Sequence, residues 1–126
     1  LEGRHFLVAE DNEINAEILE ELLEVEGATC EITENGQLVV ERFARARAGE
    51  FDAVLMDVQM PVMNGYEATR AIRAMEREDA GTIPVVAMAA NAFAEDVREA
   101  MDAGMTAHID KPVDMGTLKK TIDLYL

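Results

Sequence analysis

The sequence predicts an α/β fold, in which helices cover both faces of one parallel, doubly wound sheet to give three layers. Five short apolar segments alternate with five segments of helical periodicity, as repeated strand–helix units do. The chain has 126 residues, about the length of one domain. Right-handed crossovers leave few topologies, and we expect the strand order 2-1-3-4-5, which places the first strand beside the third.

The strands are expected in the short apolar runs. They are predicted over His5 to Glu10, Ala28 to Thr33, Ala53 to Asp57, Pro84 to Met88 and Ala107 to Asp110. The third run is the most apolar, which indicates that it lies at the centre of the sheet.

The helices are expected where a capping residue precedes an apolar period near 3.6. Asn12, Asn35 and Asp114 can cap the first, second and last helices, and the third follows Asn64-Gly65. The first helix ends at Gly27, the second by Gly49 and the fourth at Gly104. The apolar faces are expected to comprise Ile14, Ile18, Leu19, Leu22 and Leu23; Leu38, Val39, Val40 and Phe43; Ala68, Ile72 and Met75; Phe93, Val97 and Met101; and Met115, Leu118, Ile122 and Tyr125.

Composition excludes several classes of protein. The formal net charge of −15 argues against a nucleic-acid surface and suits a protein that binds cations or basic partner faces. No apolar stretch reaches the ~18–20 residues that cross a bilayer, and no signal peptide is present. Cys30 is the only cysteine, which fits a reducing cytoplasm, and it is expected to be a small core residue. The run Leu1-Glu2-Gly3-Arg4 looks like the product of a cut made just before His5. We therefore expect the chain to be one module of a longer protein, or else a processed or tagged short protein.

Charged residues follow three of the predicted strands. Glu10 and Asp11 end the first, Asp57 ends the third, and Lys111-Pro112 follows the last. Ligands of such sheets bind at the carboxyl ends of the strands, where the winding direction reverses. Carboxylates together with a phosphoryl oxygen suit Mg²⁺ or Mn²⁺. Asp11 and Asp57 are the expected direct ligands, Glu10 would bind directly or through water, and the backbone carbonyl of Gln59 can add a ligand. Without a cation, the crowded carboxylates are expected to raise one another's pKa values.

Asp57 is placed to act as a nucleophile. A carboxylate can form an acyl phosphate by in-line attack, and catalysis of this transfer rests on positioning and charge neutralisation. The metal would neutralise one side of the phosphoryl group and Lys111 the other. Each residue alone is an ordinary turn or cap residue; the combination at three strand ends predicts a phosphoacceptor site.

These residues resemble the signature of response-regulator receiver domains. Glu10-Asp11-Asn12, Asp57 to Pro61 with Asn64-Gly65, and Lys111-Pro112 carry the resemblance, which spans the chain from His5 to Leu126. It implies one flavodoxin-like receiver domain over residues 1–126 and phosphotransfer to Asp57 from a phosphohistidine of a sensor kinase or a histidine phosphotransfer protein. Met60 to Gly65, Ala90-Asn91-Ala92 and Gly104-Met105 look most like receivers of hybrid sensor histidine kinases.

The resemblance also sets expectations about context. The domain is expected to be a phosphoacceptor rather than an enzyme in its own right, to be cytoplasmic even where its parent chain is attached to a membrane, and to touch neither nucleic acid nor membrane directly. It is expected to be a monomer or a weak dimer. Its responding surface would be the face of the fourth helix, fifth strand and fifth helix.

Two positions depart from the family pattern. Ala89 stands where the family has the Ser or Thr that hydrogen-bonds the phosphoryl group. His108 stands at the position of the switch aromatic, where it would either replace that ring or be a simple, partly exposed strand residue. Gln59 and Asn91 face the reaction centre by family analogy, where they would tune the lifetime of the acyl phosphate or serve merely as turn residues.

Two alternatives follow from the same residues. Since alanine cannot donate a hydrogen bond, the chain could be a degenerate receiver that docks partners without a phosphorylation switch. An aspartate-based phosphatase would need a second acid two residues after the nucleophile, and Gln59 stands there instead.

Overall fold

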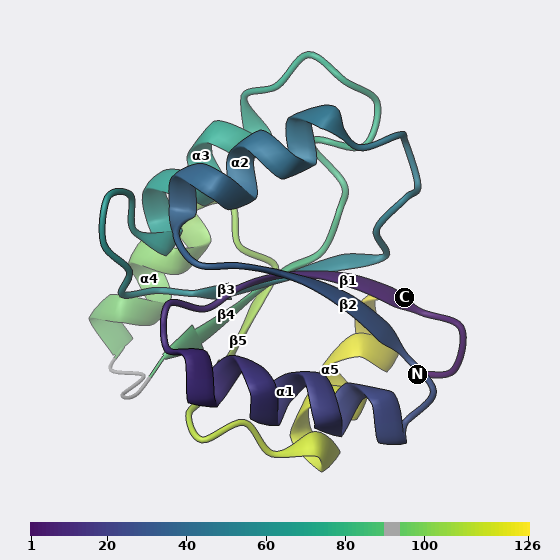
Figure 1. Cartoon of the computed structure of the whole chain (residues 1–126). Coiled ribbons are helices and arrows are strands. Elements are labelled where there is room, and N and C mark those ends of the chain that lie inside the picture. The colour runs from purple at the N-terminus through teal and green to yellow at the C-terminus, as the bar shows by residue number, and fades with distance from the viewer. Residues whose placement is uncertain (90–93) are drawn as a thin grey trace.

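The computed structural model describes residues 1–89 and 94–126 and contains the five strands and five helices that the sequence predicts (Figure 1). The strands are β1 (His5–Ala9), β2 (Thr29–Thr33), β3 (Ala53–Asp57), β4 (Val85–Ala89) and β5 (Ala107–Asp110). The helices are α1 (Glu13–Val25), α2 (Gly36–Arg45), α3 (Gly65–Arg73), α4 (Ala94–Ala103) and α5 (Met115–Tyr125). None of the helices in the described part of the chain has the length and apolar character needed to cross a bilayer.

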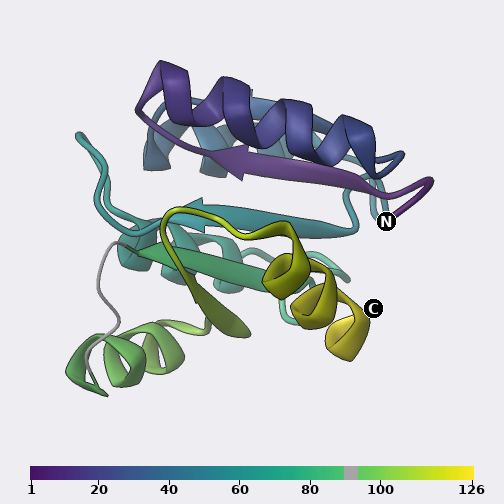
Figure 2. The same ribbon diagram turned by 90° about the horizontal axis from the view of Figure 1, so that it is seen from below.

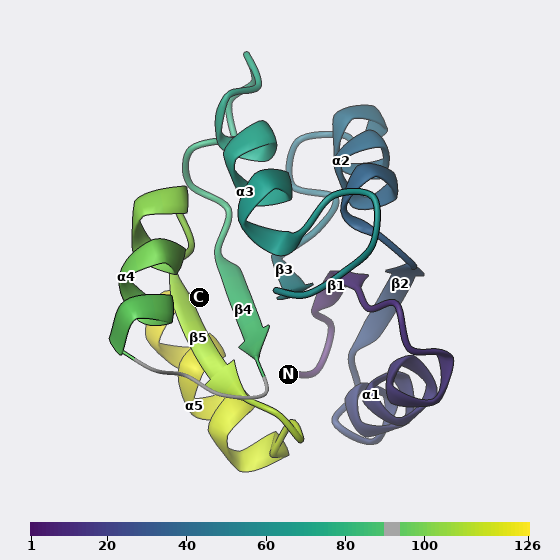
Figure 3. The same cartoon turned by 90° about the vertical axis from the view of Figure 1, so that its left-hand side faces the viewer.

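The sheet confirms the expected topology. Its order is β2-β1-β3-β4-β5, and every neighbouring pair is parallel. Helices α2, α3 and α4 cover one face, and α1 and α5 cover the other (Figures 1 and 2). Figure 3 shows α4 and α5 on either side of β5, at one edge of the sheet. Parallel strands end at a common edge, and the residues that follow β1, β3 and β5 therefore share one rim.

Each face of the sheet has its own apolar layer. Strand β1 is almost wholly buried and feeds both layers, because successive side chains point to opposite faces. Phe6 and Val8 pack with the side chains of α1 and α5, whereas Leu7 and Ala9 pack with those of α2, α3 and α4. The most apolar predicted strand, β3, lies at the centre and is buried along its whole length.

The three predicted caps are present, and a fourth helix, α3, has a cap that was not predicted. The side chains of Asn12, Asn35 and Asp114 accept hydrogen bonds from backbone N–H groups in the first turns of α1, α2 and α5. Asn64 forms a capping box with Glu67 at the start of α3. These bonds satisfy N–H groups that have no partner within the helix, so the boundaries are fixed by local chemistry.

Some residues expected on the inward faces are exposed instead. Ile14, Ile18, Leu38, Met101 and Tyr125 are 68%, 50%, 39%, 58% and 47% exposed. The reason is geometric: a helix on a sheet buries one narrow stripe. In α1 this stripe is Ala16, Leu19 and Leu23, and the two isoleucines lie outside it. Phe93 lies outside the described residues.

Cys30 is half-buried and packs beside the α1–α5 layer, as a packing role predicts. Burial, followed by the nearby charges of Glu20 and Glu24, raises the pKa of its thiol to about 11. The thiol therefore stays protonated at neutral pH, which is unfavourable for a nucleophile.

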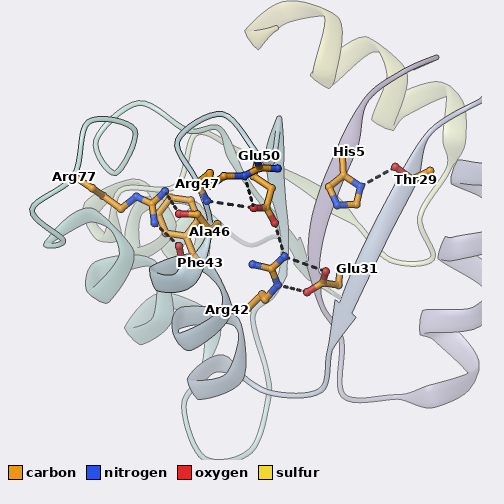
Figure 4. A network of polar contacts seen from close by, with 9 residues as sticks. All are labelled: His5, Thr29, Glu31, Arg42, Phe43, Ala46, Arg47, Glu50 and Arg77. Atoms are coloured by element: carbon orange, nitrogen blue, oxygen red, sulfur yellow. Dashed lines mark hydrogen bonds and ion pairs between the residues drawn. The ribbon is translucent and has the colours of Figure 1, made fainter.

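Two arginine networks fasten α2 to its neighbours (Figure 4). Arg42 donates to Glu31 on β2 and to Glu50 before β3. Arg77, which follows α3, donates to the carbonyl oxygens of Phe43 and Ala46 and lies over the Phe43 ring. These contacts hold the position of α2 beside the sheet.

Candidate functional site

The structure brings the three predicted acids together. Strands β1 and β3 are parallel neighbours, with Ala9 opposite Met56, so the residues that follow β1 meet the last residue of β3. Carboxylate oxygens of Glu10, Asp11 and Asp57 lie within 4.8 Å of one another. Glu10 and Asp57 are buried, whereas Asp11 is exposed at the opening.

Lys111 joins this cluster from the segment that follows β5, the edge strand of the sheet. Its backbone N–H donates to the Ala89 carbonyl at 2.8 Å, which ties the segment after β5 to the end of β4. Its Nζ donates to Glu10 Oε1 at 2.8 Å and lies 3.1 Å from Asp57 Oδ2. One ammonium group thus bridges two buried carboxylates that lie far from it in the sequence.

Burial sets the protonation of the site. Burial, then the neighbouring Glu10, raises the pKa of Asp57 from 3.8 to about 7, and Lys111 offsets this only in part. Burial also opposes ionisation of Glu10, but its contacts with Asp57 and Lys111 outweigh that and lower its pKa. Burial likewise disfavours the charged form of Lys111, but contacts with the two acids outweigh it and raise the pKa of Lys111. Without a cation, Asp57 is therefore the acid of this pair that keeps a proton near neutral pH.

The donor set fits a divalent cation. Among the described residues, Glu10 Oε2 is the buried side-chain oxygen without a hydrogen-bond partner. An unpaired carboxylate oxygen in a buried site is unfavourable, and a cation would satisfy it. Gln59 follows in the loop after β3 with its side chain exposed, two residues beyond Asp57. The role of its carbonyl as a ligand stays a prediction.

The loop from Asp57 to Gly65 has a tightly constrained backbone. The Gly65 N–H donates to the Val58 carbonyl at 2.8 Å. A Cβ on Gly65 would lie 2.4 Å from the Asp57 carbonyl oxygen, so a side chain cannot fit there. Val62 has a φ of 69°, which is rare for a β-branched residue. The peptide bond between Lys111 and Pro112, across the site, is cis.

Ala89 and His108, the two residues that depart from the family pattern, line one small hollow. Ala89, at the end of β4, and His108, on β5, border it together with Val58, Tyr66 and Val97. The His108 side chain is exposed, and Ala89 is half-buried. Asn91 lies outside the described residues, so its predicted position near the reaction centre is untested.

An apolar groove runs from the site onto α1. Its volume is about 320 Å³, and Glu10 and Lys111 are among the residues that line it. Its apolar lining consists of Ile18, Leu19, Leu22, Met88, Pro112 and Val113. No motif in the sequence indicates this groove, because it forms between α1 and the segment after β5.

The sequence does not predict a contact between Gly36 and Met63. Gly36 opens α2, and in the sequence it follows the capping Asn35 as an ordinary helix start. Only the packed structure shows that its N–H reaches the loop beside Asp57.

Comparison with known sequences points to one family. The sequence model of the response regulator receiver domain matches residues 6–123. The chain is 37% identical over 121 residues to the peroxide stress-activated histidine kinase mak1 of Schizosaccharomyces pombe, covering 95% of this chain and 7% of that protein. It is 33% identical over 119 residues to hybrid signal transduction histidine kinase I of Dictyostelium discoideum, covering 93% of this chain and 7% of that protein. The chain thus spans a small fraction of these relatives.

Solved structures share the fold. The receiver domain of a sensor histidine kinase from Pseudomonas aeruginosa, with a magnesium ion coordinated in its active site cleft, matches with a TM-score of 0.86 and 33% identity over 98% of this chain and 97% of that one. The receiver domain of Saccharomyces cerevisiae Ssk1, crystallised with the histidine phosphotransfer protein Ypd1, comes from a structure that matches with a TM-score of 0.85 and 30% identity, covering 97% of this chain and 88% of that one.

Proposed function

Because the chain belongs to the response regulator receiver domain family, we propose that it accepts a phosphoryl group onto Asp57 from a phosphohistidine of a sensor kinase or a histidine phosphotransfer protein. The observation that carries this proposal is the buried cluster in which Lys111 contacts both Glu10 and Asp57. The buried Glu10 Oε2 supports the proposal as well, because a bound cation would satisfy this oxygen.

The proposed transfer is a single in-line displacement at phosphorus. An Asp57 carboxylate oxygen attacks phosphorus, the phosphorus–oxygen bond forms as the bond to the imidazole nitrogen breaks, and the electron pair returns to the imidazole. Asp57 must be ionised for this attack. Lys111 neutralises charge on the phosphoryl oxygens after releasing its contacts with the acids.

Glu10, Asp11, Asp57 and the Gln59 carbonyl would hold Mg²⁺ or Mn²⁺, whose charge favours the ionised carboxylate and the phosphoryl group. The crystallised Pseudomonas relative, which holds magnesium in its cleft, supports this assignment.

The surface beside the site suits a protein donor. Ile14 and Ile18 are exposed on α1, Val62 is 76% exposed in the loop after Asp57, and Glu10 and Lys111 help to line the apolar groove. A helix that carries a phosphohistidine would approach Asp57 across this surface. The Ssk1 receiver, crystallised with the phosphotransfer protein Ypd1, supports a partner of this type.

The relatives support a context as well. We propose that residues 1–126 are one receiver module of a longer, hybrid histidine kinase, because the kinases it resembles are far longer than this chain. The domain would be cytoplasmic, act as acceptor rather than enzyme, and be a monomer or weak dimer, while the parent chain can be attached to a membrane. Its net charge of −15 disfavours direct contact with nucleic acid.

A second candidate rests on Ala89. The position at the end of β4 carries no hydroxyl, and His108 is exposed at the switch position. A degenerate receiver would keep the fold and the docking surface but not the switch. Gln59 and Asn91 would tune the acyl phosphate only in the phosphorylated form.

Labelling with acetyl phosphate separates the two candidates. The chain is incubated with and without Mg²⁺ and read by intact mass, with Asp57→Asn as the test variant and Asp102→Asn, on α4, as the matched control. A single Mg²⁺-dependent addition that only Asp57→Asn abolishes is expected. Addition that persists in Asp57→Asn would refute the assignment.

If small donors give no addition although the metal binds, a phosphorylated histidine phosphotransfer protein is tried next. Failure of that donor would favour the docking module. Amide spectra with beryllofluoride, an acyl-phosphate mimic, then report switching: shifts that reach His108 and Tyr125 indicate a working switch, and shifts confined to the surroundings of Asp57 do not.

A further inference from the structure

The N-terminus of α2 touches the phosphoacceptor loop through a residue that has no side chain. The Gly36 N–H donates to the Met63 carbonyl oxygen at 3.2 Å. A Cβ on Gly36 would lie 2.2 Å from that oxygen and 2.8 Å from the carbonyl carbon. Both atoms are backbone, so no rotamer change can relieve the clash. Only glycine allows α2 to approach the loop this closely.

This contact serves both partners. The first N–H groups of a helix have no acceptor within the helix. In α2, the Asn35 side chain accepts from Leu38, and the Met63 carbonyl accepts from Gly36. Gly36 is buried, so its N–H would be left unsatisfied if the loop moved away.

The loop conformation at Val62 and Met63 must be stabilised by contacts from outside the loop. Val62 precedes Met63 and has a positive φ, which a β-branched residue keeps only where the surroundings enforce it. The Met63 N–H folds back onto the Pro61 carbonyl at 2.7 Å. The Val62 side chain is 76% exposed, so its own packing cannot hold this conformation. The Met63 side chain packs against the core, and the Met63 carbonyl is held by Gly36.

Two glycines therefore hold the loop at two points. Gly65 lies against the Asp57 carbonyl at the β3 side, and Gly36 lies against Met63 at the α2 side. The segment between them includes Gln59. Both contacts limit the path of this segment, which carries the Gln59 carbonyl.

We propose that Gly36 is a positioning residue for the phosphoacceptor site: its contact with the Met63 carbonyl fixes the loop from Asp57 to Gly65 and thereby the geometry in which this loop contributes to cation binding and phosphoryl transfer. This inference rests on the proposed function, since it assigns Gly36 a part in the same site. Gly36 touches no reacting atom and acts through the loop.

The test compares Gly36→Ala with Gly81→Ala. A Cβ on Gly81 would have no neighbouring atom within 4 Å, and the φ of Gly81 is not positive, so this position controls for the glycine-to-alanine change itself. The Mg²⁺ dissociation constant is measured by calorimetry, and folding is checked by circular dichroism. Gly36→Ala is expected to weaken Mg²⁺ binding about 10-fold or more, as loss of support around metal ligands does. Gly81→Ala should match the unaltered chain.

A purely structural role for Gly36 would lower stability without changing the cation affinity of the folded protein. Ile122→Val, on the other face of the sheet, serves as the destabilised control. If Gly36→Ala folds and binds Mg²⁺ within about twofold of the unaltered chain, the positioning role is wrong.

A second measurement holds even if Gly36→Ala does not fold. In a Mg²⁺ titration of the unaltered, ¹⁵N-labelled chain, the Gly36 amide should shift with the same dissociation constant as the Gln59 amide, and the Gly81 amide should not shift. A stationary Gly36 amide would overturn the inference. Binding without labelling by any donor would refute the phosphoacceptor function alone, and a chain that binds no Mg²⁺ would refute both.

Discussion

Replacing Asp57 with asparagine should stabilise the cation-free protein at alkaline pH. Asparagine has the shape of the protonated carboxyl group and carries no charge. The pKa of Asp57 is raised from 3.8 to about 7, mainly by burial. A difference of about three pKa units corresponds to about 4 kcal/mol, which is an upper limit for the effect of Asp57→Asn above pH 7.

The gain depends on pH in a defined direction. Because the folded-state pKa lies above the unfolded value, the stability linked to the Asp57 proton is complete below about pH 4 and is lost as the pH rises through about 7. In the unaltered chain, stability should therefore fall from pH 5 to pH 8. Asp57→Asn lacks this loss, so its stability advantage should be clearly larger at pH 8 than at pH 5.

Urea unfolding followed by circular dichroism, with EDTA present, measures this difference at both pH values. Added Mg²⁺ should stabilise the unaltered chain and have a much smaller effect on Asp57→Asn, because binding to the folded state adds stability. The matched control is Asp102→Asn, on an exposed position of α4. An advantage of Asp57→Asn that is absent, or that does not grow with pH, would refute the burial argument.

Three further outcomes are expected. Ala89→Thr adds a hydroxyl donor at the end of β4 and should raise the rate of acetyl phosphate labelling about 10-fold, since a hydrogen bond to a charged group contributes about 1.5 kcal/mol; an unchanged rate by intact mass would contradict this. Lys111→Met removes the ammonium group 3.1 Å from Asp57. A carbon NMR titration should then show the pKa of Asp57 raised above its value of about 7, whereas a lowered pKa would be inconsistent with the contact. Asn64→Ala breaks the capping box of α3 and should lower the free energy of unfolding by about 1 kcal/mol, so an unchanged urea midpoint would count against the cap.

Local features of this fold could be predicted because local interactions decide them. Asn12, Asn35 and Asp114 cap helices through bonds to residues three positions away, and a sequence shows that spacing directly. The predicted inward faces were less accurate. Ile14 and Leu38 are apolar at helical spacing but exposed, because the buried stripe of each helix is set by where the helix lies on the sheet.

The order of residues was enough to predict the α/β fold, its strand order and the meeting of Glu10, Asp11 and Asp57, because parallel strands must end at one edge and these acids lie at strand ends. Their catalytic and metal-binding roles stay predictions. Lys111 was predicted to join this site, but three features could be seen only in the folded chain: Lys111 contacts both buried acids, Glu10 Oε2 has no partner among the described residues, and Gly36 donates to the Met63 carbonyl. Each of them depends on how segments distant in the sequence pack together, and no local rule predicts that packing. A difference of about 1 Å between such segments decides whether a hydrogen bond forms.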